Sequence, residues 1–275
     1  MAKIQSWEVS DTLWQQVETF VPKPPARPKR KQHYQRKPGG GRKPLPNRQI
    51  FAGIVYVLRT GCQWKALPKS FGSASAIHTH FQSSRQRGFF LALWQAGLAE
   101  YDEMEGIAWE WQRIDGTQGK APLAQEAVGN NPTDRGEKGT KRSLLVDGAG
   151  VPLSLIVSGA NRHDVKLLAA TLEAIVVVRP KASRRRRQNL CADKAYVGRP
   201  AAQAMRQRGY TPHVRQRGEE TCARRRGQKA RRWVVERTHS WFNRFRKLLV
   251  RYEKTTANFT ALLQCAAALI CFRMC

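Results

Sequence analysis

Three carboxylates of this chain stand where metal-dependent phosphodiester chemistry would need them. Asp115 ends the segment Trp-Gln-Arg-Ile-Asp, Asp193 ends Asn-Leu-Cys-Ala-Asp, and Glu236 follows Trp-Val-Val. Hard divalent cations prefer carboxylate and water oxygens, and two such ions roughly 3.5–4 Å apart stabilise the entering and leaving oxygens of a phosphodiester exchange. Two aspartates from neighbouring strands and a longer glutamate from a packed helix would supply the ligands.

Each of these acids alone has a plainer explanation. An aspartate at a strand end commonly serves a turn or a cap, and Glu236, four residues after Arg232, fits an exposed helix ion pair. The set is more persuasive because the chain has 49 Lys and Arg against 20 Asp and Glu, a formal net charge of +29. An acid needed only for stability has many surplus cations to pair with. Three acids that end apolar segments therefore indicate a site that holds metal against a polyanion.

Three other acids compete with this assignment. Asp147 begins the hairpin-turn sequence Asp-Gly-Ala-Gly, and Asp134 lies in an expected loop. Asp164 stands at an expected helix start, where N-capping is the simpler role. Of the three, Asp164 is the second choice as a metal ligand.

The charge distribution favours nucleic acid as the partner. Between Glu18 and Glu100 the chain has no Asp or Glu but fifteen Lys and Arg. Ribosomal and membrane-surface proteins share such a charge, so the charge alone leaves those classes open. The six cysteines lack zinc-type spacing, the N-terminus lacks the apolar core of a signal peptide, and no apolar run approaches the ~20 residues of a membrane span. We expect a soluble cytoplasmic protein associated with the nucleoid.

The first hundred residues predict a helical DNA-binding part. Expected helices lie within 1–20, from Asn47 as cap to near Gly61, after Gly72 with Ser73 or Ser75 as cap, and from Gly88 through Leu98. Residues 21–46, rich in Pro, Gly, Lys and Arg, predict a basic arm. The helices of 47–100 resemble a helix-turn-helix unit, although bundles without a DNA role share the pattern.

The periodicity changes to strands near residue 108. Strands are expected over 108–117, 141–147, 151–157, 189–193 and 211–215, and helices over 163–175, 200–208, 231–249 and 256–271. Three antiparallel strands, a helix, a parallel strand, a helix and a strand form the order of a ribonuclease-H-like α/β domain. We assign this domain to residues 108–275.

At these residues the sequence resembles transposases of the insertion-sequence-five family, from about Asn47 to the C-terminus. The matching blocks are Tyr-Val-Leu-Arg-Thr-Gly-Cys-Gln-Trp-Lys-Ala-Leu-Pro (56–68), Asn-Pro-Thr-Asp-Arg-Gly-Glu-Lys-Gly-Thr-Lys-Arg-Ser (131–143), Ala-Asn-Arg-His-Asp-Val-Lys (160–166), Cys-Ala-Asp-Lys-Ala-Tyr (191–196) and Arg-Arg-Trp-Val-Val-Glu-Arg-Thr-His-Ser-Trp-Phe-Asn-Arg-Phe (231–245). Five blocks in the same order make chance similarity implausible.

The resemblance implies a DDE transposase whose catalytic and metal-binding acids are Asp115, Asp193 and Glu236. It also implies Mg²⁺ or Mn²⁺, as two ions, and a ribonuclease-H-like core. The expected reaction is cleavage of the ends of an insertion sequence and their joining to target DNA. Assembly as a homodimer or larger oligomer on terminal inverted repeats of double-stranded DNA is expected.

Several polar residues are expected to contact DNA: Arg42, Lys43, Arg48, Lys138, Lys141, Arg142, Arg232, Asn243 and Arg246. The family's signature has a tyrosine and a lysine where this chain has Lys229 and Asn243. Asn243 is expected to donate to a phosphate without supplying charge, which Arg246 or Lys247 would supply instead. Trp233 and Trp241 are expected to be packing anchors, with stacking on an unpaired base as the alternative.

Two other functions would use the same features. A structure-selective nuclease would use the same acids and stop after hydrolysis, and a transposase-derived DNA-binding regulator would bind ends without cutting them. The presence of all three acids favours the transposase.

Overall fold

The computed structural model describes residues 5, 7–22, 44–214 and 233–275. Most of the expected basic arm lies outside these residues, as do Arg42, Lys43 and Arg232.

The N-terminal part is helical, as predicted. Its helices are α1 (Asp11–Glu18), α2 (Asn47–Thr60), α3 (Ala74–Gln86) and α4 (Phe89–Met104), with 3₁₀ turns η1 (Trp64–Ala66) and η2 (Lys69–Phe71) between α2 and α3. Gly61, with φ of 74°, ends α2 in the left-handed conformation that glycine adopts without strain. Pro46 occupies the N-cap position of α2, so the expected cap Asn47 is the first helical residue.

A mixed sheet forms the second part. Its strands are β1 (Trp111–Lys120), β2 (Gly129–Asn130), β3 (Lys138–Val146), β4 (Pro152–Gly159), β5 (Asn189–Ala192) and β6 (Thr211–Val214). The spatial order is β4-β3-β1-β5-β6, with the short β2 also paired to β3. The β4, β3 and β1 strands are antiparallel, whereas β1, β5 and β6 are parallel. This order confirms the predicted ribonuclease-H-like α/β architecture.

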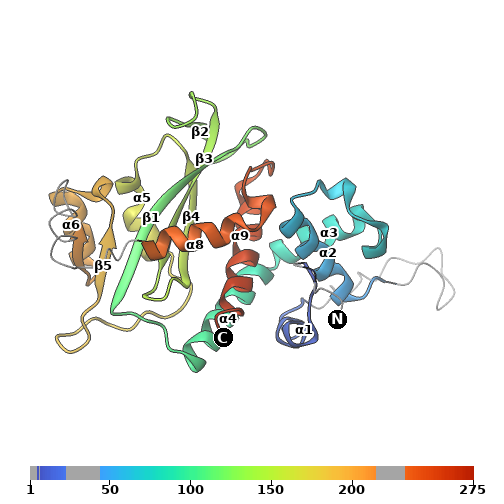
Figure 1. Ribbon diagram of the computed structural model, residues 1–275, viewed down its shortest axis with the longest axis horizontal. Coiled ribbons are helices and arrows are strands. Elements are labelled where there is room, and N and C mark those ends of the chain that lie inside the picture. The colour runs from blue at the N-terminus through green and yellow to red at the C-terminus, as the bar shows by residue number, and fades with distance from the viewer. Residues whose placement is uncertain (1–4, 6, 23–43, 215–232) are drawn as a thin grey trace, which may run out of the picture.

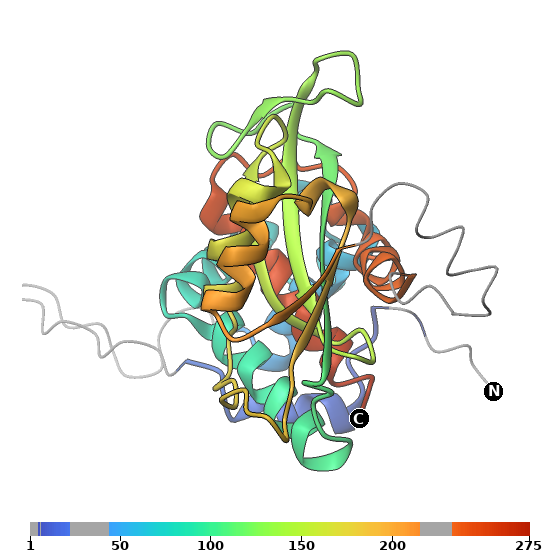
Figure 2. The ribbon, with the colours of Figure 1, turned by 90° about the vertical axis from the view of Figure 1, so that its left-hand side faces the viewer.

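Helices cover both faces of the sheet. Helices α5 (Asp164–Glu173) and α6 (Arg199–Gln207) lie on one face, and α8 (Trp233–Asn243) lies on the other (Figure 2). A 3₁₀ turn, η3 (Lys194–Tyr196), follows β5. The expected helix over 231–249 is shorter in the structure, because the chain leaves α8 after Asn243 and continues into η4 (Arg246–Leu248). The break buries the ring of Phe245 beneath the guanidinium of Arg59, 3.8 Å away.

The last helix, α9 (Thr256–Cys271), joins the two parts into one hydrophobic core. It packs against α4 on one side and β4 on the other, between the sheet and the N-terminal helices (Figure 1). Nearly every side of α9 is buried, and its apolar residues accordingly occur all around the helix. None of the helices in the described part of the chain is long and apolar enough to cross a membrane.

Candidate active site

The two aspartates singled out in the sequence lie on neighbouring strands: Asp115 is in the middle of β1, and Asp193 directly follows β5. In the parallel pairing of β1 with β5, Ile114 is opposite Ala192, and the next residues of the two strands are Asp115 and Asp193. Both residues are partly buried, and the Asp193 carboxylate accepts a hydrogen bond from the backbone N–H of Lys194. The structure therefore brings Asp115 and Asp193 to adjacent positions, where the pairing of β1 with β5 stops.

Glu236 lies in the first turn of α8. The helix crosses β1 and β3 (Figure 1) and is held by Thr238, whose hydroxyl donates to the carbonyl of Gly150 at 2.7 Å. Val234, Val235, Thr238 and Phe242 are buried in its packed side, while Glu236 is exposed. Glu236 lies three residues before His239, so the two side chains are neighbours on the helix surface.

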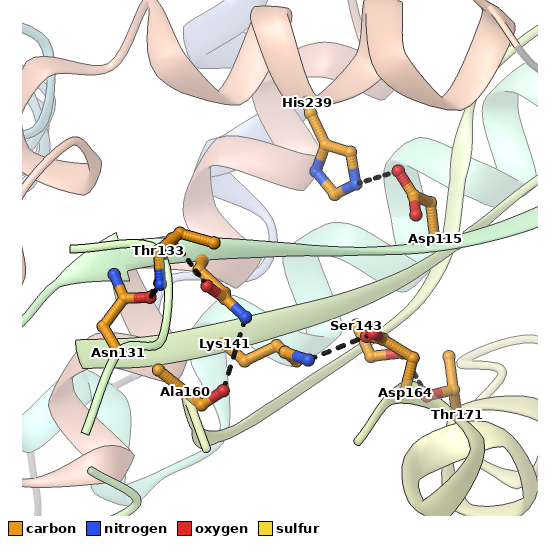
Figure 3. A network of polar contacts seen from close by, with 10 residues as sticks. Asp115, Asn131, Thr133, Lys141, Ser143, Ala160, Asp164, Thr171 and His239 are labelled. Atoms are coloured by element: carbon orange, nitrogen blue, oxygen red, sulfur yellow. Dashed lines mark hydrogen bonds and ion pairs between the residues drawn. The ribbon is translucent and has the colours of Figure 1, made fainter. Parts of the chain in front are cut away.

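His239 contacts Asp115. Its Nε2 lies 3.8 Å from Asp115 Oδ2 (Figure 3), and the imidazole is buried. Burial, followed by the nearby charge of Arg142, lowers the pKa of His239 to about 3. The ring is therefore neutral at neutral pH, and the contact is not an ion pair. The sequence reasoning missed His239, although its spacing of three from Glu236 on one helix was a usable signal.

The buried side chain of Tyr196, in the turn η3 after β5, feels the charge of three carboxylates. Burial raises the pKa of Tyr196 well above its ordinary value, and the charges of Asp164, Asp115 and Asp193 raise it further. The three carboxylates therefore lie near one buried phenol. Tyr196 was overlooked as a site residue, although it ends the Ala-Asp-Lys-Ala-Tyr block.

The donor set suits a hard divalent cation. Asp115 and Asp193 offer carboxylate oxygens, the ligand type that Mg²⁺ and Mn²⁺ prefer. Among the described residues no group of three His, Cys, Asp or Glu side chains is close enough to hold a metal ion. The residues fit the ion in chemistry: two acids occupy adjacent positions of β1 and the end of β5, and the third lies on the helix that packs across β1 and β3.

Asp164 lies on the opposite face of β1 from Asp115. Successive side chains of a strand point to opposite faces, and a Cβ added at Gly116 would lie 2.1 Å from Asp164 Oδ1. The other oxygen of Asp164 pairs with the buried Lys141 at 3.1 Å (Figure 3). The N-cap prediction for Asp164 was wrong: His163 holds the cap position, and Asp164 is the first residue of α5.

Arg142 points from β3 to α8. It donates to Asn243 Oδ1 at 3.0 Å, and burial lowers its pKa to about 10. Lys141 and Arg142 are thus both internal, with exposed fractions of 4% and 6%. This placement revises the expectation that they touch the DNA backbone, because each is turned inward to a partner within the protein.

The other expected DNA contacts differ in their surroundings. Arg48 forms a 2.6 Å ion pair with Asp11 and donates to the carbonyl of Val9 at 2.8 Å, which ties α1 to α2. Lys138 and Arg246 are exposed at the surface. The neighbouring Lys247 is internal: its Nζ donates to the carbonyl of Cys62 and lies 3.7 Å from Glu253.

The two remaining rival acids have the roles that the sequence predicted. Asp147 is fully buried in the β3–β4 turn, where its Oδ1 accepts from the backbone N–H groups of Ala149, Gly150 and Val151 at 2.8–2.9 Å. Asp134 lies in a loop and pairs with Lys120 at 3.2 Å.

The packing prediction was wrong for Trp233. Its side chain is 52% exposed, whereas Trp241 is partly buried. The guanidinium of Arg237 lies 4.7 Å from the ring centroid of Trp233 and 4.8 Å from that of Trp241, so one cation contacts both rings.

Comparison with known sequences identifies the family. A family described as "Transposase DDE domain" matches residues 107–271, more than half of the chain. The chain belongs to the DDE transposase family. A second family, described as "Putative transposase of IS4/5 family", matches residues 9–94. The transposase is thus an enzyme that binds DNA, cleaves it and transfers strands, and its family implies a divalent metal ion.

Two relatives from Burkholderia cepacia are similar to parts of the transposase. One, named "Putative transposase for insertion sequence element IS402", is 36% identical over 53% of this chain and 68% of its own length. The other, "Insertion element IS402 uncharacterized 16.2 kDa protein", is 27% identical over 45% of this chain and 80% of its own length.

Solved structures give only a weak likeness. A pre-cleavage Mos1 transpososome matches with 11% identity and a TM-score of 0.29, over 85% of this chain and 81% of that chain. The Mos1 mariner paired-end complex with Mn matches with 10% identity and a TM-score of 0.28, over 87% and 81%. The fold assignment rests instead on the strand order and the family match.

Proposed function

We propose that this transposase cleaves the ends of an insertion sequence and joins them to target DNA, with Asp115, Asp193 and Glu236 as the ligands of two Mg²⁺ or Mn²⁺ ions. The observation that supports this most strongly is the parallel register of β1 and β5, which makes Asp115 and Asp193 neighbours. When bound, the ions would activate water or a 3′-hydroxyl and stabilise the charge on the leaving oxygen. The protein's part is to hold these ligands in place.

Helix α8 is held by two contacts, at His239 and Asn243, on the helical face that also carries Glu236. His239 touches Asp115, and Asn243 accepts from the buried Arg142 of β3. These contacts fix the helix over β1 and β3, and we propose that they present Glu236 to the two aspartates. We assign Arg142 and Asn243 to this positioning role.

The DNA backbone would be contacted by exposed cations. Lys138 and Arg246 suit this role because both lie at the surface. Arg42, Lys43 and Arg232, which lie outside the described residues, stay predicted contacts on the strength of their charge. Arg48 would act by holding α1 against α2 beside that surface.

We assign DNA recognition and DNA cleavage to different parts of the chain. Residues 47–100 would read the terminal inverted repeats, and residues 108–275 would carry out the chemistry. Cleaving two ends in one event requires two active sites, so a homodimer or larger oligomer on paired ends is proposed. Binding to chromosomal DNA would hold the protein at the nucleoid.

One incubation separates this function from its alternatives. Labelled duplexes carrying the DNA that flanks the gene are mixed with plasmid, Mg²⁺ and the protein. Label joined to the plasmid supports transposition. Cleavage without joining would instead indicate a structure-selective nuclease, and a shifted band without cleavage a DNA-binding regulator. In the same assay Asp115→Asn removes one proposed metal ligand. Asp134→Asn, which removes a loop acid instead, is its matched control.

A further inference from the structure

Three arginines from distant parts of the chain line one small cavity. Arg59 comes from the last turn of α2, Arg244 follows α8, and Arg273 follows α9. The cavity has a volume of about 210 Å³, and Trp241 and Phe245 form part of its apolar wall. It lies where the N-terminal helices, the helix that carries Glu236 and the C-terminal segment meet.

Arg59 is the buried member of this group. Its side chain is 7% exposed, its guanidinium lies 3.8 Å above the ring of Phe245, and its Nε is buried without a hydrogen-bond partner. Burial, followed by the charges of Arg273 and Arg244, lowers the pKa of Arg59 to about 10. The exposed Arg244 and Arg273 therefore repel the buried guanidinium of Arg59.

No acid offsets this charge in the described part of the chain. None of the ion pairs found there involves Arg59, Arg244 or Arg273. Cys265 also faces Arg59, but burial raises its pKa to about 12, so its thiol is neutral at neutral pH. A buried cation without a counter-charge is costly, so this arrangement calls for an anion from outside the chain.

We propose that this cavity binds a phosphate group and that in the working transposase this group belongs to the backbone of the bound DNA. Guanidinium groups bind phosphate oxygens through paired hydrogen bonds, and three around one cavity suit a single phosphate. The cavity is smaller than the roughly 300–1,000 Å³ pockets that enclose drug-sized ligands, so it admits one group of a larger molecule. The apolar wall suits the adjoining deoxyribose. The DNA source rests on the function proposed above.

A bound phosphate at this place would have a structural consequence. It would connect the end of α2 to the end of α8 through Arg59 and Arg244. DNA held by the N-terminal helices would thereby be linked to the helix that carries Glu236.

The test uses the full-length protein without metal, so binding is measured apart from cleavage. In the double substitution Arg244→Gln/Arg273→Gln, called the pocket variant below, both altered side chains are exposed, which favours an intact fold. The control Arg199→Gln/Arg206→Gln removes the same charge from exposed positions of α6, on the other face of the sheet. The dissociation constant for end DNA is measured at several salt concentrations for all three proteins.

Loss of one phosphate contact should reduce the salt slope of log affinity by about 0.9 and leave the control near the wild-type slope. Equal slopes and affinities for the pocket variant and the control would overturn the proposal. Strand joining by the wild type in the assay above tests the proposed function separately.

A second arm distinguishes the source of the phosphate. Thermal unfolding is followed with inorganic phosphate and with chloride at equal ionic strength. If phosphate stabilises the wild type and not the pocket variant while their DNA slopes agree, a free anion occupies the cavity and the assignment to DNA is wrong. A weaker DNA slope for the pocket variant supports the assignment.

Discussion

The imidazole of His239 lies 3.8 Å from the carboxylate of Asp115 and is neutral. A protonated histidine here would compete with a cation for the aspartate, whereas a neutral one leaves the carboxylate charge available. The contact also joins β1 to the helix that carries Glu236. The buried side chain of His239 therefore leaves the carboxylate charge of Asp115 available and also holds the helix of Glu236 against β1.

The neutral state of His239 predicts a pH dependence of stability. Its pKa is about 3 in the folded protein against 6.5 in the reference state. Between these values the unfolded chain binds a proton that the folded chain does not, so this stability is present above pH 6.5 and is lost as the pH falls towards 3. Measured with EDTA, the wild type should lose about 1–2 kcal/mol more free energy of unfolding than His239→Gln between pH 7 and pH 5. Identical pH profiles would show that His239 is not held neutral.

Gly116, next to Asp115, lies where a side chain larger than hydrogen would not fit. A Cβ there would lie 2.1 Å from Asp164 Oδ1, whereas one at Gly119 of the same strand would have its nearest contact at 3.6 Å. Gly116→Ala should lower the free energy of unfolding by about 1–3 kcal/mol and reduce DNA cleavage, because the added Cβ overlaps the Asp164 carboxylate that Lys141 holds in place. Gly119→Ala is the control and should be tolerated in urea unfolding and cleavage assays. Equal effects of the two substitutions would contradict this account.

The Lys141–Asp164 pair tests whether Asp164 is structural or a metal ligand. Asp164→Leu leaves the buried Lys141 without its partner and should destabilise the protein by about 3–5 kcal/mol. The double variant Lys141→Met/Asp164→Leu removes both charges and should recover most of that stability and retain cleavage. A folded double variant that binds DNA but does not cleave it would place Asp164 among the catalytic acids.

The sequence predicted those features that hydrophobic periodicity encodes. The strand order followed from runs of alternating or continuous apolar residues, and the range 256–271 matches α9 because that helix is apolar throughout. The adjacency of Asp115 and Asp193 followed from the parallel pairing that this order implies.

The directions of charged side chains could not be predicted in the same way. Lys141 and Arg142 are consecutive in a strand and point to opposite faces, one to Asp164 and the other to Asn243. Those partners lie 23 and 101 residues further along the chain. In a protein with so many cations, periodicity does not distinguish internal cations such as these two from those that face solvent. The early end of α8 likewise depends on Phe245 packing against Arg59, a contact between distant segments.

The central claim is that Asp115, Asp193 and Glu236 form a metal site that faces DNA. The most direct measurement compares the affinity for end DNA of the wild type and of Asp115→Asn/Asp193→Asn/Glu236→Gln, with and without Mg²⁺ at fixed ionic strength. Without metal the acids repel the phosphate, so the triple variant should bind more tightly. Added Mg²⁺ should strengthen binding by the wild type more than by the variant, since its general competition for phosphates weakens both alike. If both proteins respond to Mg²⁺ identically, these three residues do not form a metal site at the DNA interface.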